Sequence, residues 1–169
     1  TLYLTKPLGT QPAMGALRVT DGEFAETVRS STERPIETIA EEAVAWMTTP
    51  NRSAATAARE FASAATDVTG FGLAGQARVL AERSGVGVTL TDLPIIAGTH
   101  ELSTLFGYGL ATGESAETSG GLLLSISPDR EDDFGAALAD ADVFYREVGR
   151  VTAGEGVTLD DPSREEIER

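Results

Sequence analysis

The stretch Thr66–Gly75, TDVTGFGLAG, contains residue types that could bind phosphate in two different ways. Gly70, Gly72 and Gly75 form a G-x-G-x-x-G pattern, which is typical of the turn that holds the pyrophosphate of a dinucleotide. Asp67, three residues before the first glycine, could instead offer carboxylate oxygen to Mg²⁺, whose other ligands are phosphate oxygens and water. The stretch therefore predicts either a dinucleotide site or a metal–phosphate site.

The flanking residues favour these interpretations unequally. Asp92 ends a predicted strand about 20 residues further on, where dinucleotide folds place the acid that binds the ribose. However, the segment Ser63–Asp67 is small and polar, whereas the dinucleotide fold needs a buried strand there. The Asp67 carboxylate would also repel a pyrophosphate unless a cation lay between them. A third interpretation, which the residues alone favour, is that Asp67 merely caps the following helix or hydrogen-bonds the turn.

The composition limits the classes of partner. The chain has 169 residues, 27 of them acidic and 13 basic, which gives a net charge of −14. Such a chain repels nucleic acid and anionic membranes, so neither is an expected partner. The acidic residues are spread along the chain, which predicts the solvated acidic surface that suits high salt and resembles that of halophilic proteins.

The rare residue types exclude several kinds of site. The chain has no cysteine and a single histidine, so thiolate chemistry and a multi-histidine zinc site are excluded. No apolar run approaches the roughly 18 residues of a membrane span, and no N-terminal signal pattern is present, so the expected location is the cytoplasm.

The periodicity predicts helices and strands that form an α+β (mixed α/β) domain. Helices are expected over 35–50, 51–61, 71–83 and 128–138, and strands over 2–4, 63–68, 86–93, 120–126, 143–151 and 157–159. This order predicts a mixed sheet with helices packed on one face. We expect one domain over residues 1–160, followed by a charged, frayed tail over residues 161–169.

Three separate stretches carry a resemblance to a known family. They are Leu4–Thr10 (LTKPLGT), Thr66–Leu73 (TDVTGFGL) and Thr118–Leu123 (TSGGLL). In this order they resemble the C-terminal half of the selenophosphate synthetase (selenide, water dikinase) family, within the wider aminoimidazole-ribonucleotide-synthetase-like superfamily. Met47–Arg52 (MTTPNR) is similar to the segment between the first two helices of that family.

The resemblance implies a function and a site. The function is a kinase-type, ATP-dependent transfer in which selenide, ATP and water give selenophosphate, AMP and phosphate. Asp67 would be the Mg²⁺ ligand, and no catalytic residue is expected within this chain. The residues implied to line the nucleotide cleft, with the weakest candidate last, are Thr69, Gly70, Thr118, Ser119, Gly120, Gly121 and Asn51.

The resemblance also implies what lies outside the chain. The family's N-terminal ATP-binding domain, with its glycine-rich loop, is absent from these 169 residues, so we expect half of an active site that is inactive alone. The full-length form is expected to be a homodimer. Two departures from the family pattern, Gln76 in place of His and Ser115–Glu117 in place of Asp-Pro-Gln, leave open an alternative: a non-catalytic homologue that binds a nucleotide or a partner.

Overall fold

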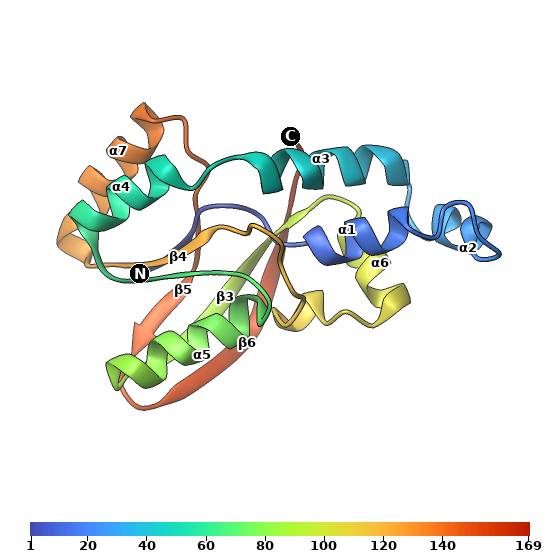
Figure 1. Ribbon diagram of the computed structural model, residues 1–169. Helices are drawn as coiled ribbons and strands as arrows, with labels where there is room; N and C mark the ends of the chain where they lie inside the picture. The colour runs from blue at the N-terminus through green and yellow to red at the C-terminus, as the bar shows by residue number, and fades with distance from the viewer.

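A six-stranded mixed sheet forms the centre of the molecule (Figure 1). The computed structural model describes residues 1–169. The strands are β1 (Leu2–Leu4), β2 (Ala62–Asp67), β3 (Gly87–Ile96), β4 (Leu122–Ile126), β5 (Arg146–Thr152) and β6 (Gly156–Ile167). They lie in the order β2-β4-β1-β5-β3-β6, and every neighbouring pair is antiparallel except β3 and β6.

Seven α-helices accompany the sheet. They are α1 (Thr10–Leu17), α2 (Ala25–Ser30), α3 (Ile36–Thr48), α4 (Arg52–Phe61), α5 (Gly72–Ser84), α6 (Thr99–Phe106) and α7 (Glu131–Asp140), with short 3₁₀ turns at Leu110–Thr112 and Pro128–Arg130. The predicted mixed α/β class is confirmed, and α1 and α2 fill the region before Arg34 that the sequence pattern did not resolve. None of the helices combines the length and the apolar character needed to cross a membrane.

The helices cover both faces of the sheet, whereas the sequence pattern predicted helices on one face. Neighbouring residues of β4 point to opposite faces, so Leu123 packs in one core with Leu73 of α5, while Leu124 packs in another with Phe134 of α7. Figure 1 shows α5 on one side of the strands and the α4–α7 pair on the other. Strand β4 therefore packs against apolar side chains on both faces, which the expectation of helices on one face did not include.

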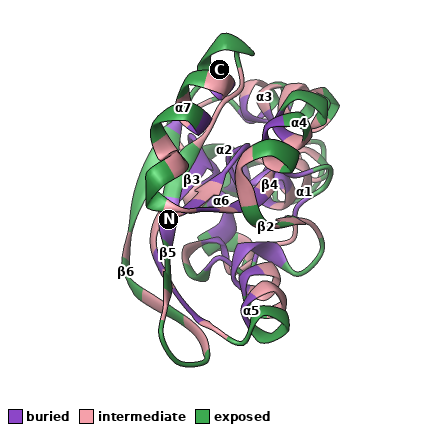
Figure 2. Cartoon of the chain, turned by 90° about the vertical axis from the view of Figure 1, so that its left-hand side faces the viewer, coloured by how far each residue is buried: buried purple, intermediate pink, exposed green.

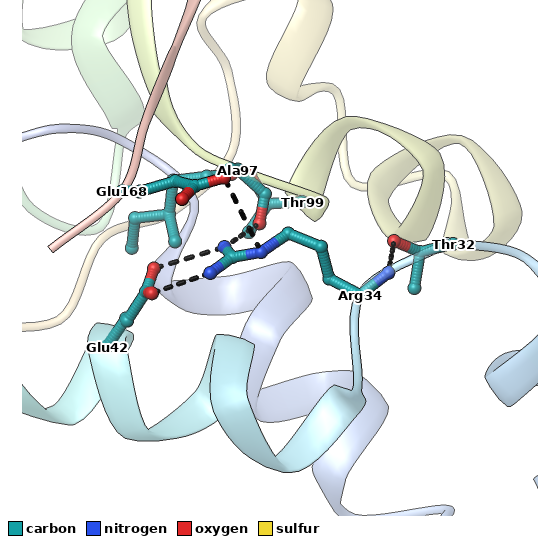
Figure 3. Close-up of polar contacts among 7 residues, drawn as sticks. Thr32, Arg34, Glu42, Ala97, Thr99 and Glu168 are labelled. Carbon is teal, nitrogen blue, oxygen red and sulfur yellow. Dashed lines mark hydrogen bonds and ion pairs between the residues drawn. The ribbon is translucent and has the colours of Figure 1, made fainter.

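A third core joins α1, α3 and α6 beside the sheet. It is built from small and branched residues such as Ala13, Ala16 and Ile39, which let these helices pack closely. Arg34, just before α3, ties this layer to the sheet (Figure 3). Its guanidinium donates to both carboxylate oxygens of Glu42, at 2.6 and 3.1 Å, and to the carbonyl oxygen of Ala97 at 3.0 Å.

The C-terminal residues are ordered as a strand, which corrects the expectation of a frayed tail over 161–169. Strand β6 continues to Ile167, whose side chain is buried, and the amide of Ala97 donates to the Ile167 carbonyl oxygen at 3.0 Å. β6 pairs in parallel with β3 along the edge of the sheet. The side chains of β6 are mostly exposed (Figure 2), so charged residues are tolerated in this edge strand. The high density of charged residues is why the sequence pattern predicted a solvated tail instead of a strand.

Candidate functional site

The three stretches that carry the family resemblance meet at one end of three adjacent strands. Asp67, the last residue of β2, lies opposite Leu122 at the start of β4. On the other side of β4, the amide of Leu122 donates to the Thr5 hydroxyl at 2.8 Å, and the Thr5 amide donates to the Leu122 carbonyl oxygen at 3.1 Å. The sheet thus brings together residues that are more than a hundred positions apart in the chain.

The Gly120–Gly121 pair allows two backbones to approach the turn before β4. A Cβ atom on Gly120 would overlap the Val68 carbonyl oxygen, and one on Gly121 would lie 2.5 Å from the Lys6 amide nitrogen. The Val68 amide donates to the Gly121 carbonyl oxygen at 2.9 Å, which fixes the turn beside the end of β2. Glycine is therefore required at both positions by packing.

Two side chains hold this turn from the neighbouring segments. The Lys6 ammonium group donates to the Ser119 carbonyl oxygen at 2.7 Å, and the Asn51 side-chain amide donates to the Gly120 carbonyl oxygen at 2.8 Å. Asn51 precedes α4 as expected, but its side chain makes no capping hydrogen bond, because the amide is directed to the turn. Ser119 has a φ of 49°, a left-handed conformation that these contacts stabilise.

The carbonyls of this turn are satisfied while its amides are not. No protein acceptor takes the backbone N–H groups of Ser119, Gly120 or Gly121. Consecutive N–H groups without a protein partner form the kind of concavity that binds anions. Three consecutive amides of residues predicted to line the nucleotide cleft are thus without a protein acceptor, and two of these residues, Gly120 and Gly121, are buried.

Glu117 clamps the turn to the start of α1. Its buried carboxylate accepts hydrogen bonds from the amides of Gly9 and Thr10, at 2.8 and 2.9 Å, and from the Thr10 hydroxyl at 2.5 Å. The same hydroxyl accepts from the Thr118 amide at 3.0 Å. Burial raises the pKa of Glu117 to about 7, and the hydrogen bonds from Thr10 and Gly9 oppose that rise only in part.

The Asp67 carboxylate is exposed and has no partner within the protein. No hydrogen bond or ion pair engages it, and α5 begins at Gly72 without any side-chain cap. The interpretation of Asp67 as a helix cap therefore fails. A free carboxylate of this kind fits a Mg²⁺ ion, which takes one or two protein carboxylates and fills its remaining positions with phosphate oxygens and water. No group of three or more His, Cys, Asp or Glu residues gathers anywhere in the chain, so Asp67 stands alone as the candidate ligand.

The strand order excludes the dinucleotide interpretation of the glycine pattern. That fold needs the strands before and after the helix to be parallel neighbours in one βαβ unit. Here β2 is an edge strand, antiparallel to β4, and three strands separate it from β3, which carries Asp92. Gly72 has a packing role instead, since its φ is 65° and a Cβ there would lie 2.5 Å from the Gly113 carbonyl oxygen.

The remaining predicted residues lie around the same turn. Thr69 accepts a hydrogen bond from the Glu117 amide at 3.0 Å through its carbonyl oxygen, and Gly70 and Thr118 are exposed beside it. The predicted site residues are thus neighbours in space. Two residues of the site were missed: Lys6, which is the only lysine and lies in the LTKPLGT stretch, and Glu117, which was noted only as a departure from the family pattern.

Comparison with known proteins identifies the family. The family described as AIR synthase related protein, C-terminal domain, matches residues 1–162. The selenide, water dikinase of Methanococcus maripaludis is 42% identical over 158 residues, which are 89% of this chain and 47% of that protein. The selenide, water dikinase of Methanocaldococcus jannaschii is 43% identical over 164 residues, which are 92% of this chain and 46% of that protein.

A solved structure has a similar fold. The structure of AaThiL complexed with AMPPCP and TMP has a TM-score of 0.63 and 21% sequence identity, and the match covers 100% of this chain and 49% of that one. The chain spans about half the length of each of these relatives. On its sequence and its fold, the chain belongs to the AIR synthase related protein family, as a C-terminal domain of that family.

Proposed function

We propose that this chain is the C-terminal half of a selenophosphate synthetase, which converts selenide, ATP and water into selenophosphate, AMP and phosphate. The observation that carries the proposal is the exposed, unpaired carboxylate of Asp67 at the strand end where the three motif stretches meet. The 42–43% identity to two selenide, water dikinases supports the reaction assigned to it.

In this proposal the residues of the chain position charge and do not form covalent intermediates. Asp67 would hold Mg²⁺ through its carboxylate, and the ion would supply positive charge beside the phosphates. The unpaired amides of Ser119, Gly120 and Gly121 and the exposed hydroxyl of Thr118 offer hydrogen bonds to phosphate oxygens. Thr69, Gly70 and Asn51 shape the adjoining walls of the cleft.

The proposed site needs a second wall. One carboxylate cannot hold the metal ions on a triphosphate, and the structure contains no cluster of acidic residues that could do so. The remaining ligands and the glycine-rich loop would come from an N-terminal ATP-binding domain, within a homodimeric, cytoplasmic full-length protein. The isolated 169-residue chain is therefore expected to turn over no ATP.

The experiment that tests this proposal measures AMP and phosphate formed by the full-length protein from Mg-ATP, with and without selenide. Selenide-dependent release of both products is expected. ATP binding without any turnover would favour the alternative, a non-catalytic homologue that binds nucleotide. In that case Gln76, which replaces the usual histidine, would be the first residue to revert, because it accepts a hydrogen bond at 3.4 Å from Thr66, the neighbour of Asp67.

A further inference from the structure

A cavity of about 840 Å³ lies beside the Lys6 stretch. Its walls are the Thr5–Lys6 pair, the connection between α3 and α4 with the first turn of α4, the segment that follows α7, and Arg169 at the end of the chain. Figure 1 shows the C-terminal end of the chain reaching the end of α3, in agreement with these walls. Asp67 does not line this cavity.

The charge of the cavity is opposite to that of the chain. The protein carries a net charge of −14, yet Lys6, Arg52 and Arg169 line the cavity, with Asp142 as its only acidic residue. None of the three basic side chains forms an ion pair with a carboxylate. In a chain with about twice as many acidic as basic residues, three basic side chains without a carboxylate partner in one cavity favour the binding of an anion there.

Lys6 is the most unusual of these charges. Its side chain is 3% exposed, and its only hydrogen bond is the one to the Ser119 carbonyl oxygen, so the ammonium charge is not neutralised. Burial, and then the nearby Arg169 guanidinium, lower the pKa of Lys6 below its usual value. A bound anion would offset both effects through its attraction to the ammonium group.

The first turn of α4 contributes polar hydrogens to the same cavity. Arg52, Ser53 and Ala54 line it, and the first backbone hydrogen bond of the helix is donated by Ala55 to Asn51 at 2.8 Å. The three preceding amides have no acceptor within the helix, and no side chain caps them. Such amides bind phosphate when cationic side chains lie beside them.

The opposite wall is aromatic. Trp46 and Phe144 pack edge to face with their ring centroids 5.2 Å apart, and the Arg169 guanidinium lies 4.7 Å from the Trp46 ring centroid. The Trp46 indole nitrogen is buried and has no hydrogen-bond acceptor in the protein. The cavity thus combines a cationic end with an aromatic wall.

We propose that this cavity binds the phosphoryl dianion of a small ligand through Lys6, Arg52 and the first turn of α4. The volume and the aromatic wall leave room for an organic group, so inorganic phosphate and a nucleoside monophosphate such as AMP share the binding chemistry. The proposal does not depend on Asp67 as a metal ligand. The cavity adjoins the Ser119–Gly121 turn, because Lys6 and Asn51 both line it and donate to carbonyl oxygens of that turn.

Trp46 allows a direct test, because it is the only tryptophan of the chain and lines the cavity. Its fluorescence is followed while inorganic phosphate, or AMP in a parallel titration, is added to the 169-residue chain at constant ionic strength with EDTA present. We expect saturable binding of at least one of them. Lys6→Met and Arg52→Gln should each weaken that binding about tenfold or more, because each removes hydrogen bonds to a charged ligand.

Two control variants separate this cavity from a general effect of charge and from the proposed metal site. Arg59→Gln removes the same charge from the last turn of the same helix, outside the cavity. Asp67→Asn alters the proposed metal site, which does not line the cavity. Both variants should bind phosphate or AMP as the wild type does. Arg52 is exposed, so its variant decides the question even if the Lys6 variant fails to fold. The proposal is overturned if neither ligand binds saturably, if Arg52→Gln binds normally, or if either control loses binding as Arg52→Gln does.

Discussion

Replacing Glu117 by glutamine is expected to remove a pH dependence from the stability of the fold. The Glu117 carboxylate is buried and accepts three hydrogen bonds from Gly9 and Thr10. Burial raises its pKa from the ordinary value of 4.5 to about 7. Between these two pH values the folded protein holds a proton that the unfolded chain has released, so stability falls as the pH rises through this range and levels off above it.

The size of this effect follows from the shift. At about 1.4 kcal/mol per pKa unit, a rise from 4.5 to about 7 corresponds to roughly 3 kcal/mol of unfolding free energy. The glutamine side chain keeps an oxygen that can accept from Gly9, but it does not titrate. The difference in unfolding free energy between the wild type and Glu117→Gln should therefore fall by roughly 3 kcal/mol between pH 4.5 and pH 7.5.

The assay is urea unfolding of both proteins at a series of pH values, monitored by circular dichroism. Taking the difference removes the contributions of the other carboxylates, which titrate in both proteins. Glu114→Gln is the matched control, since Glu114 is an exposed carboxylate of the same loop. A wild-type minus Glu117→Gln difference that stays constant across this pH range would refute the account of Glu117 as a buried, proton-binding clamp.

Three further predictions address the packing and the surface. Gly120→Ala should destabilise the fold by at least about 2 kcal/mol, because the new Cβ overlaps the Val68 carbonyl oxygen. Gly70→Ala is the control, since no atom lies within 4 Å of its Cβ, and it should unfold at nearly the wild-type urea concentration. Arg34→Met should lower the unfolding free energy by about 2 kcal/mol, because it leaves the half-buried Glu42 carboxylate and the Ala97 carbonyl oxygen without their donor. Arg29→Met breaks a more exposed pair with Glu37 and should change the unfolding free energy little. Equal losses in the two variants would contradict this reasoning. The net charge of −14 predicts a melting temperature that falls when molar salt is replaced by low salt, and a melting temperature that does not change would remove the idea of a salt-adapted surface.

Local sequence patterns predicted the elements whose apolar periodicity is strong. The helix that follows Pro35 and the strand that follows Val86 are in the structure as α3 and β3 within a few residues of their expected limits. Strand β6 was truncated in the prediction because Asp160, Asp161 and the charges beyond them look like a solvated tail. Its order depends on pairing with β3, a long-range contact that local patterns do not encode.

The site was predictable only in part for the same reason. The family resemblance brought Asp67 and the Thr118–Gly121 turn into one hypothesis, and the sheet places them side by side. Glu117 was noted as a change of residue type, but its clamp on Gly9 and Thr10 joins positions more than a hundred residues apart. Asn51 was expected at the start of a helix and in the nucleotide cleft, and only the three-dimensional arrangement directs its amide to Gly120.

The kinetics of Asp67→Asn in the full-length protein test the central claim most directly. The variant removes the negative charge and keeps the shape of an exposed side chain that makes no hydrogen bond or ion pair in this chain, so the fold should be preserved. Asp133→Asn, an exposed carboxylate on α7, is the control. We predict that selenide-dependent turnover of Mg-ATP falls about a hundredfold or more in kcat/KM for Asp67→Asn and not for Asp133→Asn. Wild-type kinetics in Asp67→Asn would contradict the assignment of Asp67 as a metal ligand.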